Sequence, residues 1–366
     1  MGGASISDPG FVTKTQVVTP LEQTQFVDPR SAETLRGLSV TSVEELLGLI
    51  AADPDAVAEF LPHLDLPQIQ ADAGTVVRAP LLAEFASFEN PDFAMGAWAP
   101  EDIEAEKRAS AAYVEEWLPE AAVEVDQDKA EQPAMSVIDC FGPIRNQGKR
   151  GTCVAHAVCA VLECQEARRK GEKNDLSEQF VYCNAKANDG SADIEGTWLR
   201  VAMPLAERDG ACLESVWPYN PLKTPGNEGQ GPPPPAAQPD ALDHLLVDPV
   251  ELDPRDPAPM RDALDGGRPI GLSVPVYNNW YSNPAANALG LIPMPLPNSV
   301  RKGGHAVCLA GYGWDPDFAG GGFFIVRNSW GTGWAPQSPI APGYGAIPFL
   351  YVERYAWESW TTADGA

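Results

Sequence analysis

Around Cys153 the chain reads Gln147-Gly148-Lys149-Arg150-Gly151-Thr152-Cys153-Val154-Ala155-His156-Ala157. A glycine-rich turn runs into an apolar stretch, which predicts a helix from Cys153 to about Arg169 with Gly171 as its end. Backbone N–H groups at the start of a helix stabilise negative charge, so a thiol placed there is expected to have a lowered pKa and to act as a nucleophile. The alternative is a buried structural cysteine, because cysteine is among the residue types most often buried.

A cysteine nucleophile needs a base that holds it as a thiolate, and the four histidines are the candidates. His63 lies among acidic N-terminal helices and is expected on the surface, and His244 has no supporting pattern. His156 follows Cys153 by three residues on the same predicted helix, where it is expected to pack or hydrogen-bond. His305 opens a predicted strand in another lobe, and a cleft between lobes is where substrates usually bind. We therefore predict that His305 is the partner of Cys153.

Asn328 is the candidate that would orient this base. An Asn or Asp that hydrogen-bonds the far ring nitrogen of a histidine fixes its tautomer. Asn328 ends a predicted strand and precedes Ser329-Trp330-Gly331-Thr332-Gly333-Trp334. The alternative is that Asn328 only caps a glycine-rich turn and that both tryptophans belong to the core.

The pattern of secondary structure changes along the second part of the chain. Helices are predicted over 177–183 and 196–207, and the proline-rich stretch 221–240 is expected to be a surface loop or a boundary. Strands are predicted over 269–276, 305–312, 322–328 and 347–352. A helical half (about 136–240) followed by a strand-rich half (about 241–366) predicts an α+β domain of two lobes.

Residues 1–135 are expected to form a separate, acidic and mainly helical region. Residues 1–130 hold 24 acidic and 7 basic side chains, which gives −17 of the chain's net −26. A capping-box pattern at Thr41-Ser42-Val43-Glu44 predicts a short helix to Ile50, and Asp53-Pro54 opens another. A third helix is predicted over 101–118. The remaining stretches read as an extended arm (1–35), a part without clear period (62–100) and a linker (121–135).

The composition excludes several classes of function. The strong net negative charge repels nucleic acid phosphate, and there is no basic stripe. No apolar run approaches 18 residues, so no membrane span is predicted, and no basic segment precedes an apolar block at the N-terminus. We expect a cytoplasmic protein, with secretion by another route as the alternative.

The seven cysteines argue against a metal site, because no CxxC pair occurs among them. Neither a metal nor another cofactor is therefore predicted. Cys159 and Cys164 lie five residues apart on different faces of one predicted helix, so they cannot easily pair with each other. Most of the thiols are expected to be reduced, with a disulfide at Cys183 or Cys212 left open.

The order Gln147, Cys153, His305 and Asn328 resembles the papain family of cysteine peptidases. The stretches 147–153, 304–307 and 328–334 are similar to the family's nucleophile, histidine and asparagine segments, and the last matches without a change. Further similarity lies in Ser177-Glu178-Gln179 and Trp217-Pro218-Tyr219. The resemblance covers about residues 138–357, and three separated motifs in the right order make it specific.

The resemblance implies a papain-like fold and a set of roles. Cys153 attacks the peptide carbonyl, His305 pairs with it and protonates the leaving amine, and Asn328 orients His305 beneath Trp330. Gln147 and the backbone N–H of Cys153 form the oxyanion hole. The resemblance also implies substrate contacts at five positions: Gly151, Thr152, Gly196, Gly304 and Trp330.

Several departures from the family pattern leave questions open. Arg150 stands where many relatives have a disulfide cysteine, and Val154 and His156 replace aromatic residues, which together favour a bacterial-type branch. Residues 1–135 do not resemble the usual propeptide. We expect this region to occupy the cleft of its own chain as a propeptide, with a fixed accessory or partner-docking module as the alternative.

The predicted activity is hydrolysis of a peptide or protein substrate through a thioester acyl-enzyme. Two alternatives remain from the sequence. An amine could replace water in the second half-reaction, which would make the protein a peptidyl or amide transferase. A permanently blocked cleft would instead leave a non-catalytic peptide-binding protein on a peptidase scaffold.

Overall fold

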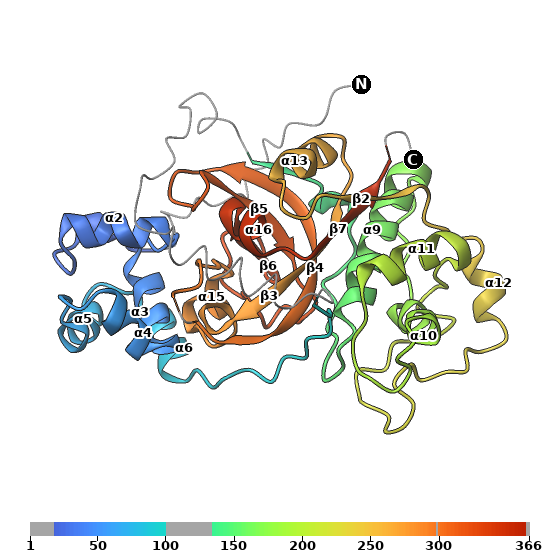
Figure 1. Ribbon diagram of the computed structural model, residues 1–366, viewed down its shortest axis with the longest axis horizontal. Helices are drawn as coiled ribbons and strands as arrows, with labels where there is room; N and C mark the ends of the chain where they lie inside the picture. The colour runs from blue at the N-terminus through green and yellow to red at the C-terminus, as the bar shows by residue number, and fades with distance from the viewer. Residues whose placement is uncertain (1–17, 100–133, 298, 364–366) are drawn as a thin grey trace.

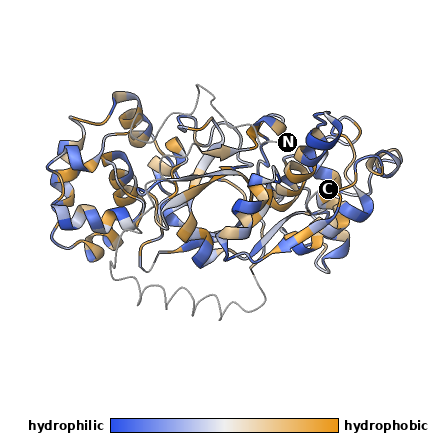
Figure 2. Cartoon of the chain, turned by 90° about the horizontal axis from the view of Figure 1, so that it is seen from above, coloured by the Kyte–Doolittle hydropathy of each residue, from blue (hydrophilic) through white to orange (hydrophobic). Residues whose placement is uncertain are grey.

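The computed structural model describes residues 18–99, 134–297 and 299–363. Together these residues form three structural parts that lie side by side. Figures 1 and 2 show, from two directions, N-terminal helices at one end, a strand-rich lobe in the middle and a helical lobe at the other end. The predicted α+β organisation in two lobes, preceded by a mainly helical region, is confirmed.

The helical lobe is built around α9 (Cys153–Lys170). It begins and ends within one residue of the predicted positions, and Gly171 closes it with φ 74°, a left-handed conformation that glycine adopts without strain. Three other helices complete this lobe: α10 (Glu178–Asn188), α11 (Leu199–Asp209) and α12 (Ala237–Ala241). The Ser177 hydroxyl accepts a hydrogen bond from the N–H of Phe180, as a serine N-cap should.

Seven strands form one sheet in the described part of the chain, in the order β2-β7-β3-β4-β5-β6, with β1 beside β4 and neighbours antiparallel. They are β1 (Met135–Ser136), β2 (Pro249–Leu252), β3 (Ile270–Tyr277), β4 (Arg301–Trp314), β5 (Gly322–Arg327), β6 (Tyr344–Pro348) and β7 (Glu358–Thr362). Short helices complete this lobe: η2 (Ile138–Cys140), α13 (Pro257–Asp265), α14 (Asn278–Tyr281), α15 (Pro284–Leu289) and α16 (Phe349–Tyr355).

The predicted strand over 347–352 is wrong from residue 349 onward. The strand ends at Pro348, and α16 begins with the next residue. A short apolar run fits either state by periodicity alone, which is why the sequence did not show where the strand gives way to the helix. β4 pairs with β3 and β5, so the predicted strands over 269–276, 305–312 and 322–328 all lie at the centre of the sheet.

The N-terminal module, residues 18–86, is more regular than the sequence suggested. Its helices are η1 (Leu21–Gln23), α2 (Pro29–Gly37), α3 (Val43–Ala52), α4 (Pro54–Phe60), α5 (Leu66–Ala73) and α6 (Ala79–Ala86). The expectation of an extended arm over 1–35 is wrong from residue 29 onward, since Asp28 caps α2 and Pro29 starts it. The capping box joins Ser42 and Glu45, one residue later than predicted. The predicted helix over 101–118 and most of the predicted linker lie outside the described residues.

One disulfide, between Cys140 and Cys164, ties η2 to α9. The other five cysteines are free, in line with the expectation that most of the thiols are reduced, and neither Cys183 nor Cys212 takes part in the disulfide. The sequence offered no local signal for this pair, because its partners are 24 residues apart and meet only through the fold. Among the described helices none is both long enough and apolar enough to cross a bilayer.

Candidate active site

Cys153 is the first residue of α9, and its side chain is fully buried. The backbone N–H of Gly96 donates a hydrogen bond to its sulfur at 3.2 Å. The sequence predicted a lowered pKa at this helix start, but burial outweighs the backbone donors and raises the pKa of Cys153 to about 11. In this state the thiol is therefore neutral.

His305 and Asn328 meet as a hydrogen-bonded pair on the strand-rich lobe. His305 Nε2 lies 2.8 Å from Asn328 Oδ1, and both residues are buried. The same Asn328 oxygen accepts the N–H of Ser329, so it faces two donors and Nε2 carries the imidazole proton. His305 Nδ1 has no hydrogen-bond partner among the described residues and is left as the basic nitrogen.

The strand that carries His305 also reaches the thiol. The backbone amide of Ala306, the next residue on β4, interacts with the Cys153 sulfur, and β4 packs against α9. Trp330 stacks on the His305 ring with centroids 4.4 Å apart and an angle of 20° between the planes. Burial lowers the pKa of His305 to about 4, although the bond to Asn328 opposes this shift. The imidazole, like the thiol, is neutral in this state.

The Gln147 side chain is held in a fixed orientation. Its Oε1 accepts a hydrogen bond from Ser329 Oγ at 2.7 Å. Its Nε2 donates to the carbonyl oxygens of Arg150, at 2.8 Å, and of Ala94, at 2.9 Å. An amide donor aimed in this way can stabilise negative charge that develops on a carbonyl oxygen beside Cys153.

Residues 93–98, which we call the cleft segment, run in extended form past these side chains. Figure 1 shows the chain leaving α6 and passing along the strand-rich lobe to the junction with the helical lobe. Ala97 forms a parallel bridge with Thr197, in which Thr197 N–H donates to Gly96 at 2.8 Å and Trp98 N–H donates to Thr197 at 3.0 Å. The N–H of Ala97 donates to Gly304 on the other lobe at 3.1 Å. The segment is thus bonded to both lobes at once.

Aromatic contacts hold both ends of the cleft segment. Phe93 stacks on Trp330 with centroids 4.5 Å apart, and Trp330 Nε1 donates to the carbonyl of Ala94 at 3.1 Å. Trp98 meets Trp198 edge to face, and its Nε1 donates to the carbonyl of Glu195 at 2.8 Å.

The five residues for which the resemblance implies substrate contacts differ in whether they contact the cleft segment. Gly304 and Trp330 bond the cleft segment directly, and Gly151 packs against Gly96. Gly196 also packs there, but the backbone hydrogen bonds come from Thr197, one residue later. Thr152 directs its hydroxyl to Tyr219 Oη at 2.6 Å instead. Sequence reasoning missed Thr197 and the cleft segment, since backbone contacts need no particular side chain.

The other histidines lie apart from this arrangement. His156 is buried, and its Nδ1 is 3.0 Å from the carbonyl of Thr152, as expected for a hydrogen-bonding helix residue. His244 Nδ1 lies 3.0 Å from a carboxylate oxygen of Glu166. His63 is exposed and reaches Ser31. No group of three or more His, Cys, Asp or Glu side chains in the described ranges could hold a metal ion.

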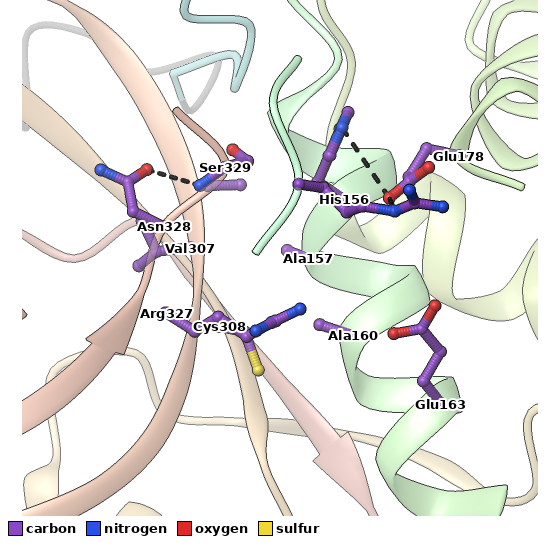
Figure 3. A pocket seen from close by; sticks show the side chains of 12 residues that line it. His156, Ala157, Ala160, Glu163, Glu178, Val307, Cys308, Arg327, Asn328 and Ser329 are labelled. Carbon is purple, nitrogen blue, oxygen red and sulfur yellow. Dashed lines mark hydrogen bonds and ion pairs between the residues drawn. The ribbon is translucent and has the colours of Figure 1, made fainter. Parts of the chain in front are cut away.

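A polar pocket lies between the two lobes. Figure 3 shows His156, Glu163 and Glu178 of the helical lobe on one side, and Arg327 at the end of β5 and the following Asn328 on the other. Burial raises the pKa of Glu163 to about 8 and that of Glu178 to about 7, while it lowers the pKa of His156 to about 4. Both carboxyl groups therefore hold protons more tightly than ordinary glutamates.

Glu163→Gln is expected to raise the melting temperature relative to wild type more at pH 8 than at pH 5. Burial raises the pKa of Glu163 from 4.5 to about 8, so its stabilising contribution is present below pH 4.5 and is lost as pH rises through 8. Glutamine keeps an oxygen that can accept the N–H of Leu176 at 3.0 Å. Thermal unfolding at both pH values checks this, with the exposed Glu172→Gln as control. Equal differences at the two pH values would contradict it.

Comparisons with known proteins identify the family of the chain. The sequence model of the papain family cysteine proteases matches residues 133–341. An uncharacterized peptidase C1-like protein of Acanthamoeba polyphaga mimivirus is 28% identical over 226 residues, which cover 59% of this chain and 68% of that protein. A cysteine protease of Blomia tropicalis is 30% identical over 58% of this chain and 57% of its own length.

A solved structure shares the fold. Xylellain, a cysteine protease from Xylella fastidiosa, superposes with a TM-score of 0.57 at 22% identity, over 75% of this chain and 98% of that chain. This chain spans about half the length of several other relatives, such as a cathepsin L-like protein of Caenorhabditis elegans. Because the family match covers more than half of the sequence, the chain belongs to the papain family of cysteine proteases and is a cysteine-type peptidase.

Proposed function

We propose that this chain hydrolyses peptide bonds through a thioester on Cys153. His305 Nδ1 takes the thiol proton and returns it to the leaving amine, and Asn328 holds the imidazole in the required tautomer. Gln147 Nε2 and the N–H of Cys153 stabilise the oxyanion. The observation that supports these roles is the hydrogen bond between His305 and Asn328, which leaves His305 Nδ1 without a partner among the described residues. His305 lies on β4, and the backbone amide of the next residue of this strand interacts with the Cys153 sulfur.

We further propose that the full-length chain is latent because its cleft segment takes the place of a substrate. The bond from Gly96 to the sulfur and the bond from Gln147 to Ala94 support this, since both use groups that a substrate would need. The segment also fills backbone positions on Thr197 and Gly304 to which a peptide could bind.

The protonation states also support latency. With the segment in place, burial raises the pKa of Cys153 to about 11 and lowers that of His305 to about 4, so the reactive thiolate–imidazolium pair is disfavoured. Loss of the segment would admit water, which stabilises both charged forms. Latency therefore combines steric exclusion with suppression of the nucleophile.

Gly96→Ala in the full-length chain is expected to raise the rate of Cys153 alkylation, and of peptide hydrolysis, by at least about tenfold. A Cβ at Gly96 would lie 1.9 Å from the backbone oxygen of Gly151, so the segment could no longer seat against the thiol. The rate is measured with a thiol-directed epoxide, with the labelled peptide identified by mass.

The matched control is Gly142→Ala, because a Cβ there meets nothing within 4 Å. This control should label at the wild-type rate. Equal labelling of wild type and Gly96→Ala would show that the cleft segment does not restrict the thiol, and latency would be rejected while the assignment of Cys153 stood.

A further inference from the structure

We propose that the N-terminal module and the cleft segment have different fates. The module, residues 18–86, remains docked on the strand-rich lobe as a permanent part of the active enzyme. The cleft segment alone leaves, and its release requires one cut on each side. The inference rests on the proposed latency, but its physical basis is the separate interface between the module and the strand-rich lobe.

Hydrogen bonds join the two parts far from the reactive thiol. The N–H of Met294 donates to the carbonyl of Leu38 at 2.9 Å. The N–H of Ala319 donates to Ser39 Oγ at 2.8 Å. In each bond the two residues are more than 250 positions apart in the sequence. The bonds therefore form only because the module docks on the lobe, and not because the residues are close along the chain.

Charged and amide side chains extend this interface across the module. Arg36 Nη1 on α2 lies 2.6 Å from Asp317 Oδ1. Asn278 Nδ2 donates to Asp53 Oδ2, the N-cap of α4, at 2.6 Å. At the far end, Gln337 Nε2 donates to Glu84 Oε1 on α6. Three helices of the module, α2, α4 and α6, are thereby fixed to the lobe.

The packing of α3 resembles that of a core helix. Its residues from Val43 to Ile50 are all buried, and a helix that is covered on every side belongs to the interior of a domain. α3 packs against α15 so closely that a Cβ on Gly48 would lie 2.2 Å from Asn283 Oδ1 and 2.5 Å from Ala285 Cβ. The apolar residues of the module belong to the same buried cluster as those of both lobes. Removing the module would therefore open the core.

The connector between the module and the cleft segment is exposed, whereas α3 is buried. Ser87, Glu89, Asn90 and Asp92 are exposed. Exposed polar stretches are preferred sites of proteolytic cutting, whereas α3 is buried from Val43 to Ile50. A protease can thus separate the segment from the module without disturbing the docked helices.

A single cut after the cleft segment would not release it. The docked module would still hold the segment beside the cleft, and tethering gives an effective concentration in the millimolar range. The bound segment would then remain an intramolecular inhibitor. Release follows only when the connector over 87–92 is cut as well.

The test uses the full chain with His305→Ala, which keeps the thiol but stops self-cleavage. Recognition sequences for a site-specific protease are introduced at 87–90, at 121–124, or at both. Native size exclusion with intact mass reports which fragments stay together. Iodoacetamide alkylation, located by peptide mass, reports the accessibility of Cys153.

After both cuts, we expect the fragment that contains residues 18–86 to co-elute with the peptidase fragment, the cleft peptide to be lost, and Cys153 alkylation to rise by at least about 100-fold. After the cut at 121–124 alone, alkylation should stay within about tenfold of the uncut rate. Separate elution of the module from a folded peptidase fragment would overturn the proposal, as would full exposure of Cys153 after that single cut. Rapid alkylation of the uncut chain would reject latency only, since co-elution does not depend on it.

A variant of the interface tests whether the two fragments co-elute because of the contacts described above. Gly48→Ala should cause the module to separate after both cuts, whereas Gly74→Ala, whose Cβ meets only a backbone oxygen at 3.7 Å, should not. Circular dichroism before cutting establishes that each variant is folded. If Gly48→Ala does not fold, Asp53→Ala removes the bond to Asn278 and is expected to weaken docking in the same assay. Co-elution that no interface variant changes would contradict docking through α3 and α4.

Discussion

Cys153→Ala, made in full-length protein that carries Gly96→Ala, is expected to lower kcat/KM for peptide hydrolysis by at least about 10⁴-fold. The thiol supplies the only bond that the acyl group forms in the proposed mechanism, so its loss removes the covalent route and leaves only binding and the oxyanion donors. Hydrolysis of a fluorogenic peptide library measures the effect, and intact mass over time measures self-cleavage in parallel.

The control for this variant is Cys183→Ala. Cys183 is free and less buried than Cys153, so a general effect of thiol loss would appear there too. This variant should keep the activity of its parent. Residual hydrolysis by Cys153→Ala within tenfold of the parent, after removal of contaminating proteases, would assign the chemistry to another residue.

Gln147→Ala in the same background is expected to lower kcat by about 10²- to 10³-fold with a much smaller change in KM. Gln147 Nε2 is a fixed donor that lies 2.9 Å from a carbonyl oxygen of the bound segment, and a donor of this kind acts mainly when charge develops on oxygen. Steady-state kinetics with a saturable peptide substrate separate the two constants.

Alkylation distinguishes this role from damage to the fold. Attack of Cys153 on iodoacetamide forms no oxyanion, so Gln147→Ala should be alkylated at nearly the parent rate while peptide turnover falls. Ser329→Ala, which removes the hydroxyl that donates to Gln147 Oε1 at 2.7 Å, should cause a smaller loss of kcat. Parallel losses of alkylation and turnover would indicate a disturbed nucleophile instead of a missing oxyanion donor.

The sequence predicted the parts of this protein that local signals determine. α9 could be placed within one residue because a turn, an apolar run and a terminal glycine all mark it. The three central strands follow from β-rich runs between glycine and proline turns. Cys153, His305 and Asn328 could be selected because their chemistry requires particular side chains, and Gln147 was implied by the family resemblance. The fold brings the surroundings of these residues together.

Features that depend on tertiary contact could not be predicted. Thr197 and Gly96 act through backbone groups, which every residue carries, so no motif marks them. The raised pKa of Cys153 comes from burial in the folded molecule, where even the donor of one hydrogen bond to its sulfur, Gly96, lies 57 residues earlier in the chain. Helix α2 is a different case, because Asp28-Pro29 is a recognisable helix start, although the stretch around it is polar.

The shared core of the N-terminal module and the two lobes has a consequence for the lifetime of the enzyme. An active protease is exposed to its own copies, and digestion of a folded chain proceeds through locally opened states. Because the module closes the core beside α15, detaching only the cleft segment would leave the cooperative unit intact. The mature enzyme would then gain activity without gaining the openings through which a neighbouring copy could digest it.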